Sequence, residues 1–107
     1  MPDYAVVFAP EAEEQLVELY LYIADQASPA IARDYTEAIV DDCLKLNHFP
    51  LRGVARDDIR PGVRITHHKG RTVIAFQVDE PSRSVAILGV FYGGQDYQAA
   101  LRPDTDH

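Results

Sequence analysis

The sequence predicts an α+β domain of three parts: an N-terminal strand, an α-helical hairpin and a three-stranded antiparallel meander. The strands are expected to form one small twisted sheet, and the helices to cover it. Three observations lead to this fold class. The chain opens on a β-branched and aromatic run at residues 4–8, apolar residues recur at helical spacing between 10 and 46, and three strand-like runs separated by turn residues follow from residue 63. Helices that pack on one face of a mostly antiparallel sheet make an α+β domain.

The first strand and the first helix are predicted from a change of pattern at residues 9 and 10. Tyr4–Phe8 is short, β-branched and aromatic, as strands are, but its position in the sheet is left open. Pro10 suits the first turn of a helix, and the acidic residues after it favour the positive end of the helix dipole. This helix is expected to end near residues 25–27. Its apolar face consists of Ala12, Leu16, Leu19, Tyr20 and Ile23.

The second helix is predicted to begin at Ser28-Pro29, a capping serine followed by proline at the first helical position. Because the joint between the two helices is very short, they are expected to fold back as a hairpin. Pro50 and the residues before it end the second helix. The apolar stripe of this helix holds Ala32, Tyr35, Ile39, Cys43 and Leu46. Cys43 is therefore predicted to be a buried core residue rather than a reactive thiol.

Three strands are predicted to complete the fold after an irregular stretch at residues 51–63. They cover residues 63–67, 72–78 and 84–91, and turns lie at residues 69–70 and 79–83. The third strand is a nearly continuous apolar run, so we expect it to be central and covered. Residues 96–101 suit one or two helical turns. One domain is thus predicted over residues 1–101, followed by a polar C-terminal tail at 102–107.

Composition and charge exclude several classes of protein. The chain has 107 residues, enough for one domain, and no apolar run long enough to cross a membrane. It has one cysteine, which excludes an internal disulfide framework, and its first residues do not resemble a secretory signal. A cytoplasmic location and no membrane partner are therefore expected. The net charge of −7 argues against generic, direct binding of nucleic acid.

The charge is unevenly distributed along the chain. Residues 1–50 carry ten acidic and two basic residues, whereas residues 51–72 carry six basic and two acidic ones. The basic segment is either ordinary solvated surface or a site for an anionic partner. Its basic residues are Arg52, Arg56, Arg60, Arg64, Lys69 and Arg71.

Few residues are arranged for chemistry. Two adjacent histidines on a predicted strand point to opposite faces and do not easily share a metal, so no metal site and no cofactor are expected. No nucleophile motif and no phosphate-binding loop is present. One set suits acid–base cleavage of RNA, with arginines on the phosphate and a histidine or tyrosine that moves a proton; the alternative is that the same residues are ordinary surface. The set is Arg64, Arg71, Arg83, His67 or His68, and Tyr92.

Several short motifs occur in a characteristic order and spacing. They are Ala9-Pro-Glu-Ala-Glu-Glu-Gln-Leu16, Leu19-Tyr-Leu-Tyr-Ile23, Phe49-Pro-Leu-Arg-Gly53, Asp57-Asp-Ile-Arg-Pro-Gly-Val-Arg64, Gly70-Arg-Thr-Val-Ile-Ala-Phe76 and Ile87-Leu-Gly-Val-Phe-Tyr-Gly-Gly94. With these motifs the chain resembles, from Tyr4 to about Leu101, the ParE branch of the RelE/ParE superfamily of bacterial toxins from toxin–antitoxin operons. The resemblance implies the RelE-like fold and a cognate ParD-like antitoxin whose C-terminal segment wraps the toxin and neutralises it.

The same resemblance implies one of two targets. RelE-type members are ribosome-dependent mRNA endonucleases that rely on lysines, arginines and a late tyrosine or histidine, whereas ParE-type members poison DNA gyrase. This chain has only two lysines, Lys45 and Lys69, and residues 57–62 look ParE-like, which favours gyrase. Tyr92 stands near the place of the late catalytic residue in the ribonucleases.

The sequence therefore predicts the toxin of a type II toxin–antitoxin system, which poisons DNA gyrase through protein–protein contact and is not itself an enzyme. The alternatives are a RelE-type mRNA endonuclease and a toxin fold whose toxicity has decayed. Tyr20 and Tyr35 are expected in the core and Tyr22 partly exposed. The residues predicted to contact a partner are Arg56, Arg60, Arg64, Arg71, Tyr22 and Tyr92.

Overall fold

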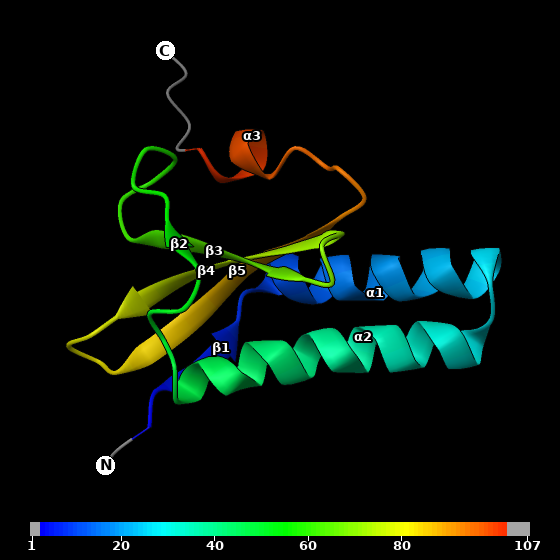
Figure 1. The fold of residues 1–107 in the computed structure, drawn as a ribbon, viewed down its shortest axis with the longest axis horizontal. Coiled ribbons are helices and arrows are strands. Elements are labelled where there is room, and N and C mark those ends of the chain that lie inside the picture. The colour runs from blue at the N-terminus through cyan, green and yellow to red at the C-terminus, as the bar shows by residue number, and fades with distance from the viewer. Residues whose placement is uncertain (1–2, 103–107) are drawn as a thin grey trace.

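The strands and helices follow one another in the predicted order, with two short elements in addition. The computed structural model describes residues 3–102. Its elements are β1 (Ala5–Phe8), α1 (Pro10–Gln26), α2 (Pro29–Leu44), the 3₁₀ turn η1 (Lys45–Asn47), β2 (Val54–Ala55), β3 (Val63–His68), β4 (Thr72–Asp79), β5 (Ser84–Tyr92) and α3 (Tyr97–Leu101) (Figure 1). The additions are η1, which continues α2, and β2.

One five-stranded sheet runs in the order β1-β5-β4-β3-β2. β3, β4 and β5 form the predicted antiparallel meander, and β1 lies at one edge, parallel to β5, with Ala5 opposite Ser84. At the other edge β2 pairs with β3 through Val54 and Ile65, so residues 51–63 are not wholly irregular, contrary to the prediction. Two residues are too few to produce a strand pattern in a sequence.

The helical hairpin covers one face of the sheet and projects beyond it at the end where α1 passes into α2 (Figure 1). The predicted cap of α2 is confirmed, because the Ile31 N–H donates to the Ser28 Oγ at 3.1 Å. The larger core lies between hairpin and sheet, and Cys43 is completely buried in it. Tyr20 and Tyr35 pack against this core, as predicted.

The other face of the sheet carries a smaller core under α3 and under the loop that follows β2 (Figure 1). This core consists of Ile59, Val63, Ile65, Ala75, Phe91 and Leu101. β5 is therefore covered on both faces, which explains its nearly continuous apolar sequence. No helix within residues 3–102 is both long and apolar enough to cross a membrane. From residue 103 on, the predicted polar tail lies outside the described residues.

Two adjacent histidines end β3, directly before the turn into β4. Lys69 and Gly70 have φ angles of 54° and 74°, and the central residues of a type I′ turn likewise have positive φ. His68 is only 5% exposed, whereas His67 is exposed, so the two side chains point to opposite faces as predicted. In the described part of the chain, no group of three metal-ligating side chains comes together.

Candidate functional site

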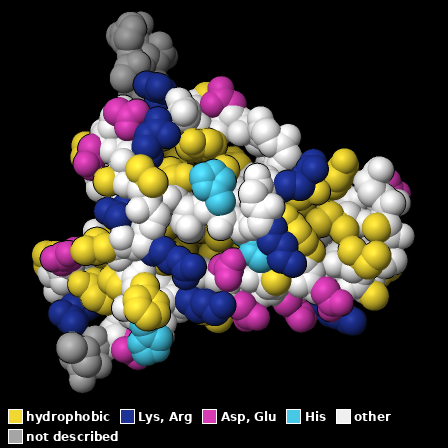
Figure 2. Space-filling view, viewed as in Figure 1, with side chains coloured by type: hydrophobic (Ala, Val, Ile, Leu, Met, Phe, Trp, Pro, Cys, Tyr) yellow, Lys and Arg dark blue, Asp and Glu magenta, His cyan; other side chains and the backbone are white. Residues whose placement is uncertain are grey.

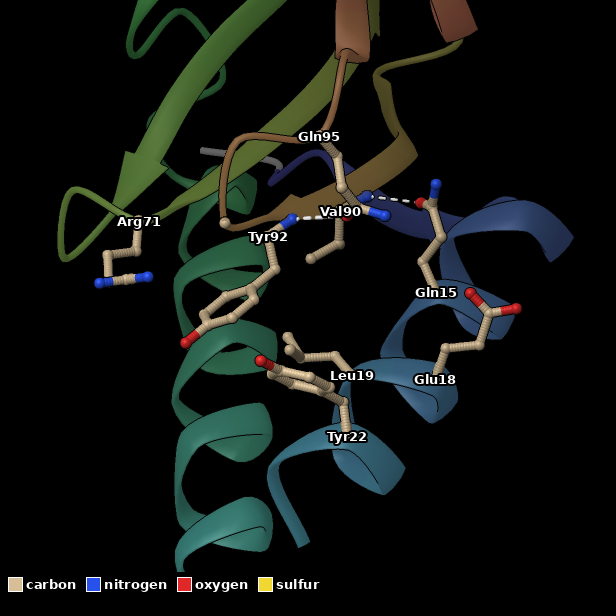
Figure 3. Close-up of a pocket in the computed structure, with 9 residues that line it drawn as sticks. Gln15, Glu18, Leu19, Tyr22, Arg71, Val90, Tyr92 and Gln95 are labelled. Carbon is tan, nitrogen blue, oxygen red and sulfur yellow. Dashed lines mark hydrogen bonds between the residues drawn. The ribbon is translucent and has the colours of Figure 1, made fainter. Parts of the chain in front are cut away.

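The second half of β5 has one free edge, and two glutamines satisfy its amides. β1 ends opposite Ile87, so the N–H groups further along β5 have no strand partner on that side. Unpaired backbone donors are costly to bury. The Gln15 Oε1 accepts the Val90 N–H at 2.7 Å, and the Gln95 Oε1 accepts the Tyr92 N–H at 2.8 Å (Figure 3). Because no strand continues beside β5, a groove remains between β5 and α1.

This groove has a volume of about 360 Å³. One wall is α1, and the other is the end of β5 with the loop that follows it (Figure 3). The lining residues are Gln15, Glu18, Leu19, Tyr22, Arg71, Val90, Tyr92, Gly93 and Gln95. The groove therefore offers one cation, one carboxylate and two phenol rings to a partner.

Tyr92 is at the centre of the contacts that build the groove. Its ring lies 6.1 Å from the ring of Tyr22 and 5.9 Å from the ring of Tyr35, between centroids. The Arg71 guanidinium lies 5.6 Å from the Tyr92 centroid, a cation–π distance. The Arg71 carbonyl also accepts the Gly93 N–H at 3.0 Å, which holds the β3–β4 turn beside the end of β5. Tyr22, which is 54% exposed as predicted, thus meets Arg71 and Tyr92 in one groove.

Arg64 does not belong to this groove. Its Nε donates to the Arg52 carbonyl at 3.0 Å. Its Nη2 donates to the carbonyls of Leu51 and Gly53 at 2.6 and 3.2 Å. The guanidinium therefore fastens the loop before β2 onto β3. The sequence predicted a phosphate or partner ligand here, and the structure places most of its donors on the protein's own backbone.

Arg56 and Arg60 lie in the loop between β2 and β3, away from the groove. Arg56 donates two hydrogen bonds to Asp58, both at 2.9 Å, and a third to the Tyr97 hydroxyl at 3.3 Å. These bonds tie the loop to α3, and the guanidinium holds the pKa of the Asp58 carboxyl below its usual range. Arg60 is half-buried. Part of the predicted basic segment therefore makes contacts within the protein itself.

The residues predicted to cleave RNA are not gathered in one place. Arg83 lies in the β4–β5 turn, where its guanidinium is 5.1 Å from the centroid of the Tyr4 ring. That turn and the Arg71 turn are at opposite ends of the eight-residue strand β4, roughly 25 Å apart. His67 is exposed on β3 and does not line the groove. Of this set, Arg71 and Tyr92 are in contact, and His68 is buried nearby, on the other side of the Tyr35 ring.

Sequence reasoning missed Gln15, Glu18 and Gln95. Gln15 and Gln95 matter because β1 is shorter than β5, a relation that no local pattern reveals. Glu18 is one of several glutamates on α1, and only the position of Gln15 beside it on the helix distinguishes it.

Comparisons with known proteins identify the family and the fold of the chain. Residues 6–97 match the model of a family described as the ParE toxin of the type II toxin–antitoxin system parDE. The fold is similar to that of a chain in the chromosomal ParDE system of P. aeruginosa, with a TM-score of 0.72 and 21% identity over 84% of this chain and 96% of that one. No curated protein sequence matches the chain significantly.

Two further solved structures share the fold. A chain of the RelBE2 toxin–antitoxin complex of Mycobacterium tuberculosis has a TM-score of 0.63 and 24% identity over 86% of this chain and 93% of that one. A mutant of the E. coli toxin RelE in the free state has a TM-score of 0.65 and 12% identity over 92% of this chain and 93% of that one. The predicted α+β fold of the RelE/ParE type is thereby confirmed.

Proposed function

We propose, because this chain belongs to the ParE toxin family of type II toxin–antitoxin systems, that it binds DNA gyrase and stabilises the cleaved DNA–gyrase complex without chemistry of its own. A cognate ParD-like antitoxin neutralises it by covering the toxin. Because both of these partners are cytoplasmic, the protein acts in the cytoplasm.

The separation of the predicted RNA-cleaving residues is the observation that carries this proposal. Cleavage of a phosphodiester needs cations, a base and an acid around the same phosphate. Arg64 is bonded to loop carbonyls, and Arg83 lies at the far end of β4 from Arg71. A toxin whose catalytic set is dispersed is better suited to act by binding.

The composition of the groove supports the same conclusion. Tyrosine and arginine are enriched among the residues that contribute most of the binding energy at protein interfaces. Tyr22, Arg71 and Tyr92 present both types at one concave surface. The net charge of −7 moreover repels ribosomal RNA at long range, so it favours a protein target over an RNA one.

A gyrase assay tests the proposal directly. Purified protein is mixed with gyrase, ATP and relaxed plasmid, and both supercoiling and the linear DNA released by denaturation are scored. We expect supercoiling to fall and linear DNA to accumulate. Tyr22→Ala and Arg71→Ala should lower the potency at least tenfold, whereas Arg52→Ala, an exposed arginine outside the groove, should match the wild type. Folded protein that leaves gyrase unaffected would overturn the proposal.

A second candidate function is ribosome-dependent cleavage of mRNA. It is favoured by the Arg71 guanidinium beside the Tyr92 ring, since a cation and a titratable hydroxyl are two of the groups that cleavage needs. Incubation with ribosomes and mRNA should leave the message intact. Cleavage that disappears in Tyr92→Phe, with folding retained, would move the assignment to the ribonuclease.

Induction of the toxin in cells tests the partner and the decayed alternative together. Expression alone should stop growth, and co-expression of the cognate antitoxin should restore it. If growth continues without antitoxin although soluble protein accumulates, the toxin fold has lost its toxicity.

A further inference from the structure

The Tyr92 ring rests on a side chain that does not line the groove. The Tyr35 ring, on α2, lies 5.9 Å from the Tyr92 ring between centroids, and the two ring planes are nearly perpendicular, at 83°. The other contacts of the Tyr92 ring are with Tyr22 and Arg71, which do line the groove (Figure 3). The position of Tyr92 therefore depends on Tyr35 as well as on residues that a partner can touch.

Two polar contacts hold Tyr35 in turn. Its hydroxyl lies 2.8 Å from the Oγ1 of Thr72, which is completely buried on β4, directly opposite Tyr92 of β5. Its ring lies 5.2 Å from the His68 ring between centroids, again nearly perpendicular to it. The His68 Nδ1 lies 2.6 Å from the Asp42 Oδ2. A continuous line of contacts thus runs from Asp42 through His68 and Tyr35 to Tyr92.

Stability alone does not account for the pair formed by Asp42 and His68. The His68 side chain is only 6% exposed, and its Nε2 is buried with no hydrogen-bond partner in the described part of the chain. An unpaired buried polar atom opposes folding, and apolar side chains of similar volume often stabilise a fold as well as a buried polar pair does. What the pair adds is direction, because a hydrogen bond to a ring nitrogen fixes the plane of the ring.

We propose that Asp42 and His68 are positioning residues for the Tyr92 groove. They fix the Tyr35 ring, and this ring holds Tyr92 in the orientation in which it meets its neighbours in the groove. Neither residue lines the groove, so both act through Tyr35. A surface that is already ordered loses less conformational freedom when a partner binds. The effect on binding rests on the proposed function, whereas the effect on the Tyr92 ring does not.

A double variant separates positioning from stability. Asp42→Ala combined with His68→Phe removes both polar partners, so it leaves no buried nitrogen unpaired, and we expect its midpoint of urea denaturation to stay close to that of the wild type. Ser28→Ala is the control. It removes the cap of α2, at the opposite end of that helix from Asp42, and should lower the midpoint without affecting the groove.

The first readout is the Tyr92 ring itself, and it needs no partner. The Tyr22 and Tyr92 rings lie 6.1 Å apart between centroids, close enough for NMR cross-peaks between their ring protons. We expect these cross-peaks to persist in Ser28→Ala. In the double variant they should weaken at least twofold, because a Tyr35 ring that is no longer fixed lets Tyr92 adopt several orientations.

The second readout is potency against gyrase, at a temperature where every variant is folded. The double variant should lose potency roughly three- to tenfold, and Ser28→Ala should match the wild type. A wild-type protein that leaves gyrase unaffected would refute the proposed function alone, since the cross-peaks still decide whether Asp42 and His68 position Tyr92.

A conservative substitution provides a further comparison, which also applies if the double variant does not fold. In Asp42→Asn the amide oxygen can still accept a hydrogen bond from the His68 Nδ1, so this variant should keep the Tyr22–Tyr92 cross-peaks that Asp42→Ala loses. Cross-peaks of equal strength in all these variants would overturn the proposal. An equal loss in Ser28→Ala would also overturn it, because the effect would then follow from lowered stability.

Discussion

The His68 imidazole Nδ1 lies 2.6 Å from the Asp42 Oδ2, and this contact joins β3 to α2. The His68 side chain is only 6% exposed, and its Nε2 has no partner. The His68 ring meets the edge of Tyr35, whose hydroxyl is 2.8 Å from the Thr72 Oγ1. The junction between hairpin and sheet is therefore polar on this side. It also fixes Tyr35, against which Tyr92 packs.

Loss of the Asp42 carboxylate should destabilise the fold. Asp42→Ala leaves both ring nitrogens of a buried histidine without a partner, which typically costs about 1–3 kcal/mol. Asp41→Ala, at the exposed neighbouring position, should stay within about 0.5 kcal/mol of the wild type. Urea denaturation measures both free energies of unfolding. Equal stabilities of the two variants would show that the contact contributes nothing.

Arg64 should prove to be a structural residue. Arg64→Ala removes donors from the carbonyls of Leu51, Arg52 and Gly53, and we expect the free energy of unfolding to fall by about 1–3 kcal/mol. Arg64→Lys should recover only part of the loss, because lysine lacks the planar fork. Arg52→Ala, whose side chain is exposed, is the control. An Arg64→Ala variant with unchanged stability but weakened partner binding would restore the role predicted from the sequence.

The helical hairpin and the meander were predictable because their signals are local. The apolar stripes repeat over four turns, and Ser28-Pro29 marks a helix start by its own chemistry. The position of β1 was not predictable in this way. Its pairing with β5 joins residues about 80 positions apart, and nothing within Tyr4–Phe8 specifies the partner.

The candidate site was likewise predictable only in part. Arg71, Tyr92 and Tyr22 were among the predicted partner residues, and the fold brings them together. Arg64 was among them as well, but its donors face a loop whose path only the tertiary structure determines. In the sequence the arginines of residues 51–72 look alike, and they differ in what the backbone places beside each one.

Gly53 should tolerate no side chain. A Cβ on Gly53 would lie 2.2 Å from the Ile65 carbonyl oxygen, and its φ is +77°. Gly94 also has a positive φ, +87°, but a Cβ there meets nothing within 4 Å. Gly94→Ala should therefore cost only the backbone strain, about 1–2 kcal/mol, and Gly53→Ala clearly more, because β2 must move away from β3. Thermal melts compare the two glycine variants. An equal fall in Tm would contradict the close approach of Gly53 to the Ile65 carbonyl oxygen.

At alkaline pH, the free energy of unfolding should depend on Cys43. Burial, and next the negative charge of Asp42, raise the pKa of this thiol from 9.0 to about 12. The unfolded thiol ionises above about pH 9, whereas the folded one stays neutral, so the unfolded state binds fewer protons between these values. Stability is therefore intact below pH 9 and falls as the pH rises toward 12, with a slope of up to about 1.4 kcal/mol per pH unit.

Cys43→Ala separates this effect from other alkaline titrations. The variant loses packing at every pH, but it lacks the thiol, so the stability difference between wild type and variant should shrink above pH 9. Denaturation under reducing conditions at pH 7 to 11 measures it. Parallel curves would contradict the raised pKa. Rapid labelling of native Cys43 by a thiol reagent at pH 8 would contradict its burial, because a buried and protonated thiol reacts only when the fold opens.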